Sequence, residues 1–200
     1  MLAPLSNTIQ GVIRFTWPMI LISSVIMISF RLCYLIKNHE KIIVYKELMM
    51  LIFGLYILCL FQVVTFQDDV TWASNNFIPF KEILRYDIRS RLFMKNVIGN
   101  MILFLPFGFF TSYYLKVEKM NLPILLTVIA SISIEVVQMM IGRVFDVDDI
   151  LLNVLGGTLG IALYMIFRMI SEKLPSFCKK DWFLNILSVI VLIGLVMLLI

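Results

Sequence analysis

The sequence predicts an all-α fold: a polytopic transmembrane bundle of about six helices, with a long outer loop that bears an interfacial helix. Hydrophobic residues make up 61% of the chain and charged residues 15%, whereas soluble domains are about 45–50% apolar and about 25% charged. The mean hydropathy is +0.98. The apolar residues also fall into long runs, each near the length of about 20 residues that crosses a bilayer.

Six apolar runs define the predicted helices in chain order. The first is too long for the apolar part of a signal peptide and lacks a small-residue cleavage site, so we expect it to be retained. The third contains Pro106 and Gly108, which predict a bend because proline removes a helical hydrogen bond. The runs cover approximately residues 12–36, 48–66, 97–115, 122–141, 150–170 and 182–200.

The basic residues near the helix ends predict how the chain is oriented in the membrane. Ten of the 17 Lys and Arg residues lie on one side, in or next to the connections at residues 37–46, 116–119 and 168–180. Most acidic residues lie on the opposite side and offset its positive charge. We therefore expect the first side to be cytoplasmic. Both termini and the connections after the second and fourth helices are then expected outside.

The connection from Gln67 to Lys95 is the long outer loop. Its first part is expected to be irregular because Asn75, Asn76 and Pro79 favour turns. Its second part, residues 80–94, places apolar residues near helical spacing. The arginines among them, which suit an anionic lipid head group, are Arg85, Arg89 and Arg91. This pattern predicts a helix lying along the outer membrane surface.

Polar residues inside the apolar runs are the candidate functional residues. Glu135 would lie roughly 10 Å deep in the fourth helix at 1.5 Å per residue, and a charge there is costly and functional by default. Alternation of helix direction brings the polar ends of the third, fourth and fifth helices into one leaflet. The main candidates for a lipid or head-group site are Glu135, Gln138, Arg143, Asp149, Asn100 and Asn153, and the secondary ones Asn96, Asp146, Asp148, Arg85, Arg89 and Arg91.

Each of these features also has a purely structural interpretation. Gly156, Gly157 and Gly160 form a small-residue stripe that lets another helix approach closely. The acidic turn before the fifth helix suits a helix N-terminus, where carboxylates are favoured, better than a metal site. The two asparagines of the third helix would then only join helices by hydrogen bonds, and Glu135 would only pair with Arg143.

The composition excludes several functional classes. The net charge of +4 is scattered along the chain, which argues against a nucleic-acid partner. The only histidine is His39, and the cysteines, Cys33, Cys59 and Cys178, are odd in number and far apart. These residues offer neither a disulfide framework nor a zinc site nor a histidine-based triad. We expect no metal and no cofactor.

Three motifs in this order resemble the VanZ-like family of bacterial membrane proteins. They are NNFIPF at residues 75–80, NVIGNMILFLPFGF at 96–109 and SIEVVQMMIGRVFDVDDILLNVLGGTLG at 133–160. The resemblance divides the chain into two N-terminal transmembrane helices at 1–69, a VanZ-like core at 70–165, and a basic cytoplasmic loop with a last transmembrane helix at 166–200. It implies a multi-pass protein of the bacterial cell membrane. The family is named for a member that lowers susceptibility to teicoplanin, a lipoglycopeptide.

Three functions remain open from the sequence. The favoured one is a non-enzymatic membrane protein that binds, in the outer leaflet, either a lipoglycopeptide or a lipid-linked peptidoglycan precursor, with membrane lipids as its other partners. An intramembrane enzyme acting on a lipid-linked phosphate would use Glu135 with Asp146 or Asp149 as acid and base, but it lacks an obvious nucleophile. A lipid transporter is the third, and the missing inverted repeat counts against it.

Overall fold

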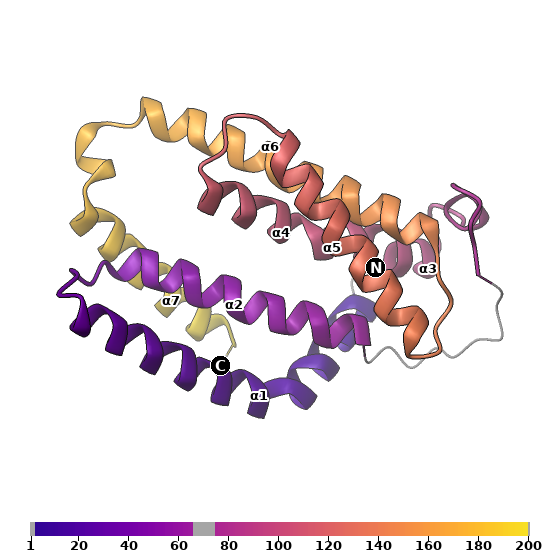
Figure 1. Ribbon diagram of the computed structural model, residues 1–200, viewed down its shortest axis with the longest axis horizontal. Helices are drawn as coiled ribbons and strands as arrows, with labels where there is room; N and C mark the ends of the chain where they lie inside the picture. The colour runs from indigo at the N-terminus through magenta and orange to yellow at the C-terminus, as the bar shows by residue number, and fades with distance from the viewer. Residues whose placement is uncertain (1–2, 66–74, 200) are drawn as a thin grey trace. The chain divides into compact units, whose positions relative to one another are not determined.

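The structure, a computed structural model, describes residues 3–65 and 75–199. Within that part of the chain the regular structure is helical apart from one isolated parallel β-bridge between Asn76 and Asp146. The longer helices are α1 (Ala3–Lys37), α2 (Val44–Thr65), α4 (Gly99–Leu115), α5 (Asn121–Met140), α6 (Val147–Lys173) and α7 (Asp181–Leu199) (Figure 1). The short ones are η1 (Ile83–Arg85), α3 (Arg91–Phe93), η2 (Met94–Ile98) and η3 (Ser176–Lys179). The predicted all-α helical bundle is confirmed.

Five helical stretches in the described residues are long and apolar enough to cross a membrane. They are Thr16–Lys37, Val44–Val63, Arg91–Leu115, Asn121–Met140 and Val147–Lys173, and α7 adds the shorter apolar stretch Asp181–Gly194. Each matches one of the six predicted runs to within a few residues, except that the third begins at Arg91 and not near residue 97, and the stretch in α7 ends at Gly194 and not near residue 200. The chain is therefore a multi-pass membrane protein.

The chain forms two compact units. One contains Leu60–Phe167 together with the N-terminal residues up to Phe15, and the other contains Thr16–Cys59 together with the residues from Arg168 onward. In the second unit, α1 and α2 are joined by an ion pair in which Arg31 Nε lies 2.7 Å from Glu47 Oε2. There the backbone N–H of Tyr45 also donates to Asn185 Oδ1 of α7 at 3.0 Å.

The first unit is built on α4, α5 and α6, which lie alongside one another (Figure 1). Their outward faces carry exposed apolar residues every three or four positions, as on α6 at Leu155, Leu159 and Leu163. The opposite face of α6 is buried, and Ile161 there is 0% exposed. This division gives the helices an apolar surface for lipid and a tightly packed interior.

Glycines bring α6 against its neighbours at backbone distance. A Cβ added at Gly156 would collide with the backbone of Met101, and one at Gly160 with the backbone of Leu105. The third glycine of the stripe, Gly157, lies against the backbone of Gly108 on α4 and the Thr127 side chain of α5. Small residues thus let three helices meet closely enough for many van der Waals contacts.

The segment before α4 differs from the single interfacial helix expected over residues 80–94. It consists of turns, the 3₁₀ turn η1, the short helix α3 and the π-helix η2, which leads directly into α4. Local side chains redirect the backbone here, since Asp87 Oδ1 accepts from the N–H of Arg89 and Ser90 Oγ caps α3 through the N–H of Phe93. Such bonds compete with a continuous helical ladder. Residues 67–74 of the predicted loop lie outside the described residues.

A candidate polar binding pocket

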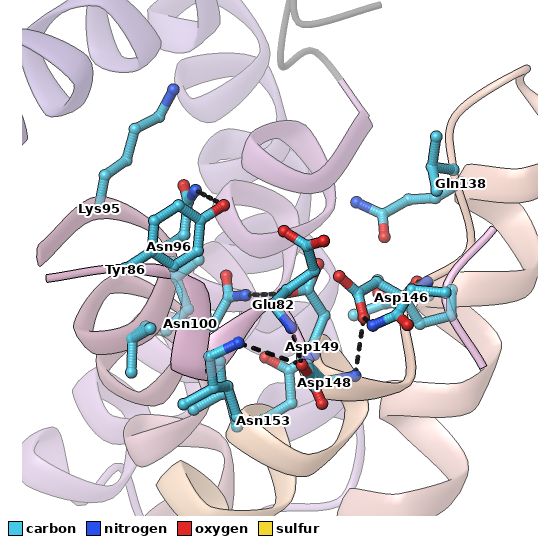
Figure 2. Close-up of a pocket in the computed structure, with 18 of the residues that line it drawn as sticks. Glu82, Tyr86, Lys95, Asn96, Asn100, Gln138, Asp146, Asp148, Asp149 and Asn153 are labelled. Carbon is cyan, nitrogen blue, oxygen red and sulfur yellow. Dashed lines mark hydrogen bonds between the residues drawn. The ribbon is translucent and has the colours of Figure 1, made fainter. Parts of the chain in front are cut away.

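A cavity of about 610 Å³ lies inside the first unit (Figure 2). It lies where residues 75–90, called the outer segment after the side of the membrane expected for them, meet the start of α4, the end of α5 and the start of α6. Its apolar lining includes Leu103, Phe104 and Ile134. Its charged lining residues are Glu82, Arg85, Lys95, Glu135, Arg143, Asp146, Asp148 and Asp149, and its other polar ones are Asn76, Tyr86, Asn96, Asn100, Gln138 and Asn153. The cavity has the size of small-molecule sites but is more polar than most of them.

The end of α5 places three lining residues. Gly142 adopts a left-handed φ of 86°, which allows the N–H of Arg143 to donate to the carbonyl of Gln138 at 2.9 Å. The N–H of Gly142 donates to the carbonyl of Met139 at 3.1 Å. This is the glycine-based Schellman ending of a helix. It turns the chain so that Arg143 lines the same cavity as Glu135 and Gln138.

Asp146 begins α6 and ties it to the outer segment. Its Oδ1 accepts from the N–H of Asp148 at 2.9 Å, as an N-cap residue does, and from Asn76 Nδ2 at 2.8 Å. The backbone of Asn76 also donates to the carbonyl of Phe145 and accepts from the N–H of Val147. Burial raises the pKa of the Asp146 carboxyl above its ordinary value, while the bonds from Asp148 and Asn76 act against that rise.

Asp148 holds the outer segment in place. The residue is 1% exposed, and its Oδ1 accepts from the N–H of Phe80 at 2.5 Å while its Oδ2 accepts from those of Glu82 at 2.7 Å and Ile83 at 3.2 Å. Phe80 follows Pro79 and has a left-handed φ of 65°, a conformation that needs such support. The geometry gives Asp148 a structural role at the edge of the cavity.

Glu135 is the one acidic residue of α5, and it is 1% exposed. Its Oε2 accepts from the backbone N–H of Asp146 at 3.1 Å, which offsets part of the cost of burying a carboxyl group. Arg143 interacts electrostatically with both Glu135 and Asp149. The simple Glu135–Arg143 pair considered from the sequence is therefore part of a wider group that includes the α6 N-terminus.

The asparagines of the cavity each donate to a neighbouring element. Asn100 Nδ2 donates to Asp149 Oδ1 at 2.5 Å, and Asn153 Nδ2 donates to Ser131 Oγ at 3.1 Å. Asn96, which lies in the π-helix η2, donates to the Tyr86 hydroxyl at 3.0 Å. The i,i+4 pair Asn96 and Asn100 thus reaches two different partners, one in the outer segment and one in α6.

The cavity brings together all six main candidates and leaves out two of the secondary ones. Arg89 and Arg91 are exposed and do not line it, whereas Arg85 does and lies 3.3 Å from Glu82 Oε2. The candidate list lacked four polar lining residues: Asn76, Glu82, Tyr86 and Lys95. Of these, only Asn76 carried a signal, because it belongs to the NNFIPF motif.

Among the residues that the structure describes, no three His, Cys, Asp or Glu side chains group in a way that would hold a metal ion. The carboxylates of the cavity are instead held by protein N–H groups, as the bonds to Asp148, Asp146, Glu135 and Asp149 show. The arrangement can therefore bind a polar molecule through oxygen acceptors, a few donors and three nearby cations.

Comparison with known sequences identifies the family. The profile of the VanZ/LLP1 family matches residues 53–168, a range that contains the cavity, α4, α5 and most of α6. No curated protein and no solved structure matches the chain. Since the match spans more than half of the sequence and includes the helices that build the polar cavity, the chain belongs to the VanZ/LLP1 family of proteins.

Proposed function

We propose that this protein lowers the susceptibility of a bacterium to teicoplanin and related lipoglycopeptides. It does so at the outer leaflet of the cell membrane, by binding the polar head of an amphiphile, either the drug or a lipid-linked cell-wall precursor. The observation that carries the proposal is the polar cavity of about 610 Å³ at the end of three membrane-spanning helices. An amphiphile can place its head there while its tail follows the apolar surface of those helices.

The burial of charge at this site favours a ligand role. An acid at the centre of a membrane helix costs about 2.5–3.5 kcal/mol on insertion scales, and such residues usually mark binding or transport sites. Glu135 lies in such a helix and is 1% exposed. Packing alone would be satisfied by an apolar side chain at this position. The polar cavity beside Glu135 supplies the functional reason for keeping an acid there.

The lining chemistry favours a binder over an enzyme that forms a covalent intermediate. None of the residues that line the described cavity is Ser, Thr, Cys or His. The lining therefore lacks the Ser–His and Cys–His pairs that activate common nucleophiles, and several of its carboxylates are held by protein N–H groups. A purified preparation that converts a lipid-linked phosphate into a new product, and loses that turnover in Glu135→Gln, would support the enzyme instead.

Drug susceptibility of cells carrying single substitutions tests the proposal. Glu135→Gln and Arg143→Gln should raise teicoplanin susceptibility to that of cells lacking the protein. Gln at 135 keeps an oxygen for the N–H of Asp146 but removes the charge. The control is Glu172→Gln, at the far end of α6, where the exposed Glu172 side chain pairs with Arg168 at 3.1 Å; it should leave susceptibility unchanged.

Membrane abundance of each variant must be measured on the same cells, for example by immunoblot of a tagged chain. If both cavity variants reach wild-type abundance and wild-type resistance, the cavity is not the site of action. If all variants including Glu172→Gln lose resistance, the loss is unrelated to the cavity.

A further inference from the structure

We infer that the head bound in this cavity is a saccharide, a neutral or amine-bearing group rich in hydroxyls, and not a bare phosphate. The inference rests on the proposed function and names the class of ligand for the same site. It depends on which hydrogen-bonding groups of the lining are already used by the protein and on the sign of the charge that remains.

The amide donors of the cavity are turned toward the protein. Four asparagines line it, and each directs its amide nitrogen to a protein oxygen. For two of them the acceptor is a carboxylate, so the assignment of nitrogen and oxygen follows from chemistry: Asn76 donates to Asp146 and Asn100 donates to Asp149. At least half of the N–H groups of these four amides are therefore used within the protein and are not offered to a ligand.

The charges of the lining point the same way. Five carboxyl groups line the cavity, those of Glu82, Glu135, Asp146, Asp148 and Asp149, against the three cations Arg85, Lys95 and Arg143. Each of these carboxyl groups would repel a phosphate when it is ionised. Hydroxyl and ammonium groups donate hydrogen bonds to carboxylates and meet no such repulsion.

The cations do not form a clamp for a phosphate. Arg85 pairs with Glu82, and Arg143 interacts with Glu135 and Asp149. In Figure 2 the Lys95 side chain points away from the group formed by Glu82, Asp146 and Asp149. Phosphate sites normally converge several Arg or Lys side chains, or a row of backbone N–H groups, on one point. Here the row of N–H groups at residues 80–83 is taken by Asp148.

The apolar part of the lining also suits a sugar. A saccharide ring has hydroxyl groups at its edge and C–H groups on its faces. Leu103, Phe104 and Ile134 provide apolar wall beside the polar groups, and the Tyr86 ring is fixed by the hydrogen bond from Asn96. A volume of about 610 Å³ lies within the range of about 300–1,000 Å³ of small-molecule sites.

Two sources offer this chemistry: the glycan of a lipid-linked wall precursor and the sugars of a lipoglycopeptide. Matched probes separate them from a phosphate ligand. The full-length protein in phosphatidylcholine nanodiscs would be titrated with a polyprenyl diphosphate and with the same lipid carrying a disaccharide. It would also be titrated with a glycopeptide that has no acyl chain and with the aglycone of that glycopeptide, so that the two members of each pair differ only in their sugars. Binding of at least one sugar-bearing probe should be about tenfold tighter than that of its sugar-free partner, or about 1.4 kcal/mol.

The substitution Asp149→Asn gives a change of opposite sign for the two ligand classes. It keeps an oxygen for Asn100 Nδ2 but replaces the other carboxyl oxygen, an acceptor, with an amide N–H donor. Affinity for the sugar-bearing probe should fall by about tenfold, as expected when a hydrogen bond to a charged group is lost. Affinity for the polyprenyl diphosphate should instead rise. Glu172→Gln, at the far end of α6, should change neither.

Equal or tighter binding of the sugar-free probes would overturn the saccharide assignment, as would higher affinity of Asp149→Asn for a sugar-bearing probe. The proposed function fails separately. If sugar-bearing probes bind as expected but Glu135→Gln cells keep wild-type teicoplanin resistance, the saccharide site stands and its role in resistance does not. If Glu135→Gln cells lose resistance while only the sugar-free probes bind, the proposed function stands and the saccharide assignment does not.

Discussion

Three acidic residues at the start of α6 have three different roles. Asp146 caps the helix, Asp148 binds the backbone of the outer segment, and Asp149 accepts from Asn100 of α4. From the sequence they form one acidic turn that suits a helix N-terminus. The partners that distinguish them lie up to 68 positions away, and local sequence patterns carry no information on such contacts.

Asp148→Asn should loosen the outer segment. The replacement presents an amide nitrogen to backbone N–H groups and loses hydrogen bonds to a charged acceptor, each worth about 1.5–3 kcal/mol. Limited trypsin digestion followed by mass spectrometry should show faster cleavage at Lys81 and Arg85 than in the wild type. Glu172→Gln, at the far end of α6, is the control. Equal cleavage rates in wild type and Asp148→Asn would mean that Asp148 does not anchor the segment.

Asp146 should make stability depend on pH. Its pKa is raised mainly by burial, so the folded protein holds a proton that the unfolded chain releases at the ordinary value of about 3.9. Stability contributed by this group is present below that value and is lost as the pH rises through the raised pKa. Asp146→Asn keeps a capping oxygen without this titration.

Thermal unfolding in detergent checks this prediction. The melting temperature of Asp146→Asn relative to the wild type should increase between about pH 4, near the ordinary pKa of the group, and about pH 8. A difference that is constant or that decreases over this range would show that the carboxylate is not penalised in the folded state.

Candidate residues of the cavity could be named from the sequence where a polar side chain interrupts an apolar run. Glu135, Asn100 and Asn153 are such residues, and the structure places all three on one cavity. Glu82, Tyr86 and Lys95 escaped notice because they lie in a segment that is already polar. Their place in the lining depends on how Asp148 and Asn76 fold that segment back onto α6.

At the level of elements, the contact of α6 with α4 depends on glycine. The spacing of Gly156, Gly157 and Gly160 indicated a close helix contact, but it did not indicate which surface of a neighbouring helix packs against these glycines. The structure shows that surface to include Gly108 of α4, a residue considered in the sequence only as part of a bend. Periodicity reveals which face of a helix packs, whereas the partner depends on the three-dimensional arrangement.

Gly156→Ala or Gly160→Ala should destabilise the bundle. The added Cβ would meet backbone atoms of α4, which cannot move aside as a side chain can, so the cost should reach or exceed the about 1–3 kcal/mol typical of overpacking. A lower melting temperature and aggregation on size-exclusion chromatography would report it. Gly99→Ala and Gly194→Ala meet no close atom and serve as controls. Wild-type stability of both α6 variants would argue against the glycine contact.

The outer segment shows where periodicity misleads. Its apolar residues have near-helical spacing, yet Leu84 is 82% and Ile88 73% exposed, and only short helical turns form. Asp87 accepts from the N–H of Arg89, and Ser90 caps the start of α3 through the N–H of Phe93, so the backbone does not continue as one helix. Spacing predicted an amphipathic surface here, but the backbone bonds of these residues decide its local structure.

For the whole molecule, apolar run length was enough to predict the helices and the membrane. It was not enough to predict the two units, because their boundaries fall inside α1, α2 and α6. Run length also gave no indication that Arg31 pairs with Glu47 between α1 and α2. Contacts between helices are needed to see both features.

The predicted orientation can be measured on whole cells. In a chain whose cysteines Cys33, Cys59 and Cys178 are replaced, a single cysteine at Asp87 should react with a membrane-impermeant maleimide added outside. A single cysteine at Glu118, in the connection between α4 and α5, should react only after the cells are opened. The reverse labelling would invert the topology and move the cavity to the cytoplasmic leaflet.

The π-helix Met94–Ile98 makes the start of α4 sensitive to chain length. Its bond from the N–H of Gly99 to the carbonyl of Met94 encloses one residue more than an α-helical bond, and each residue of an α-helix turns the chain by about 100°. Removing Ile98, a residue of η2 that does not line the cavity, would restore the α-helical ladder but rotate everything before it by about that angle. Tyr86 and Lys95 would then leave the cavity while Asn100 stayed. A one-residue deletion therefore offers a way to divide the cavity into two halves without substituting any side chain in its lining.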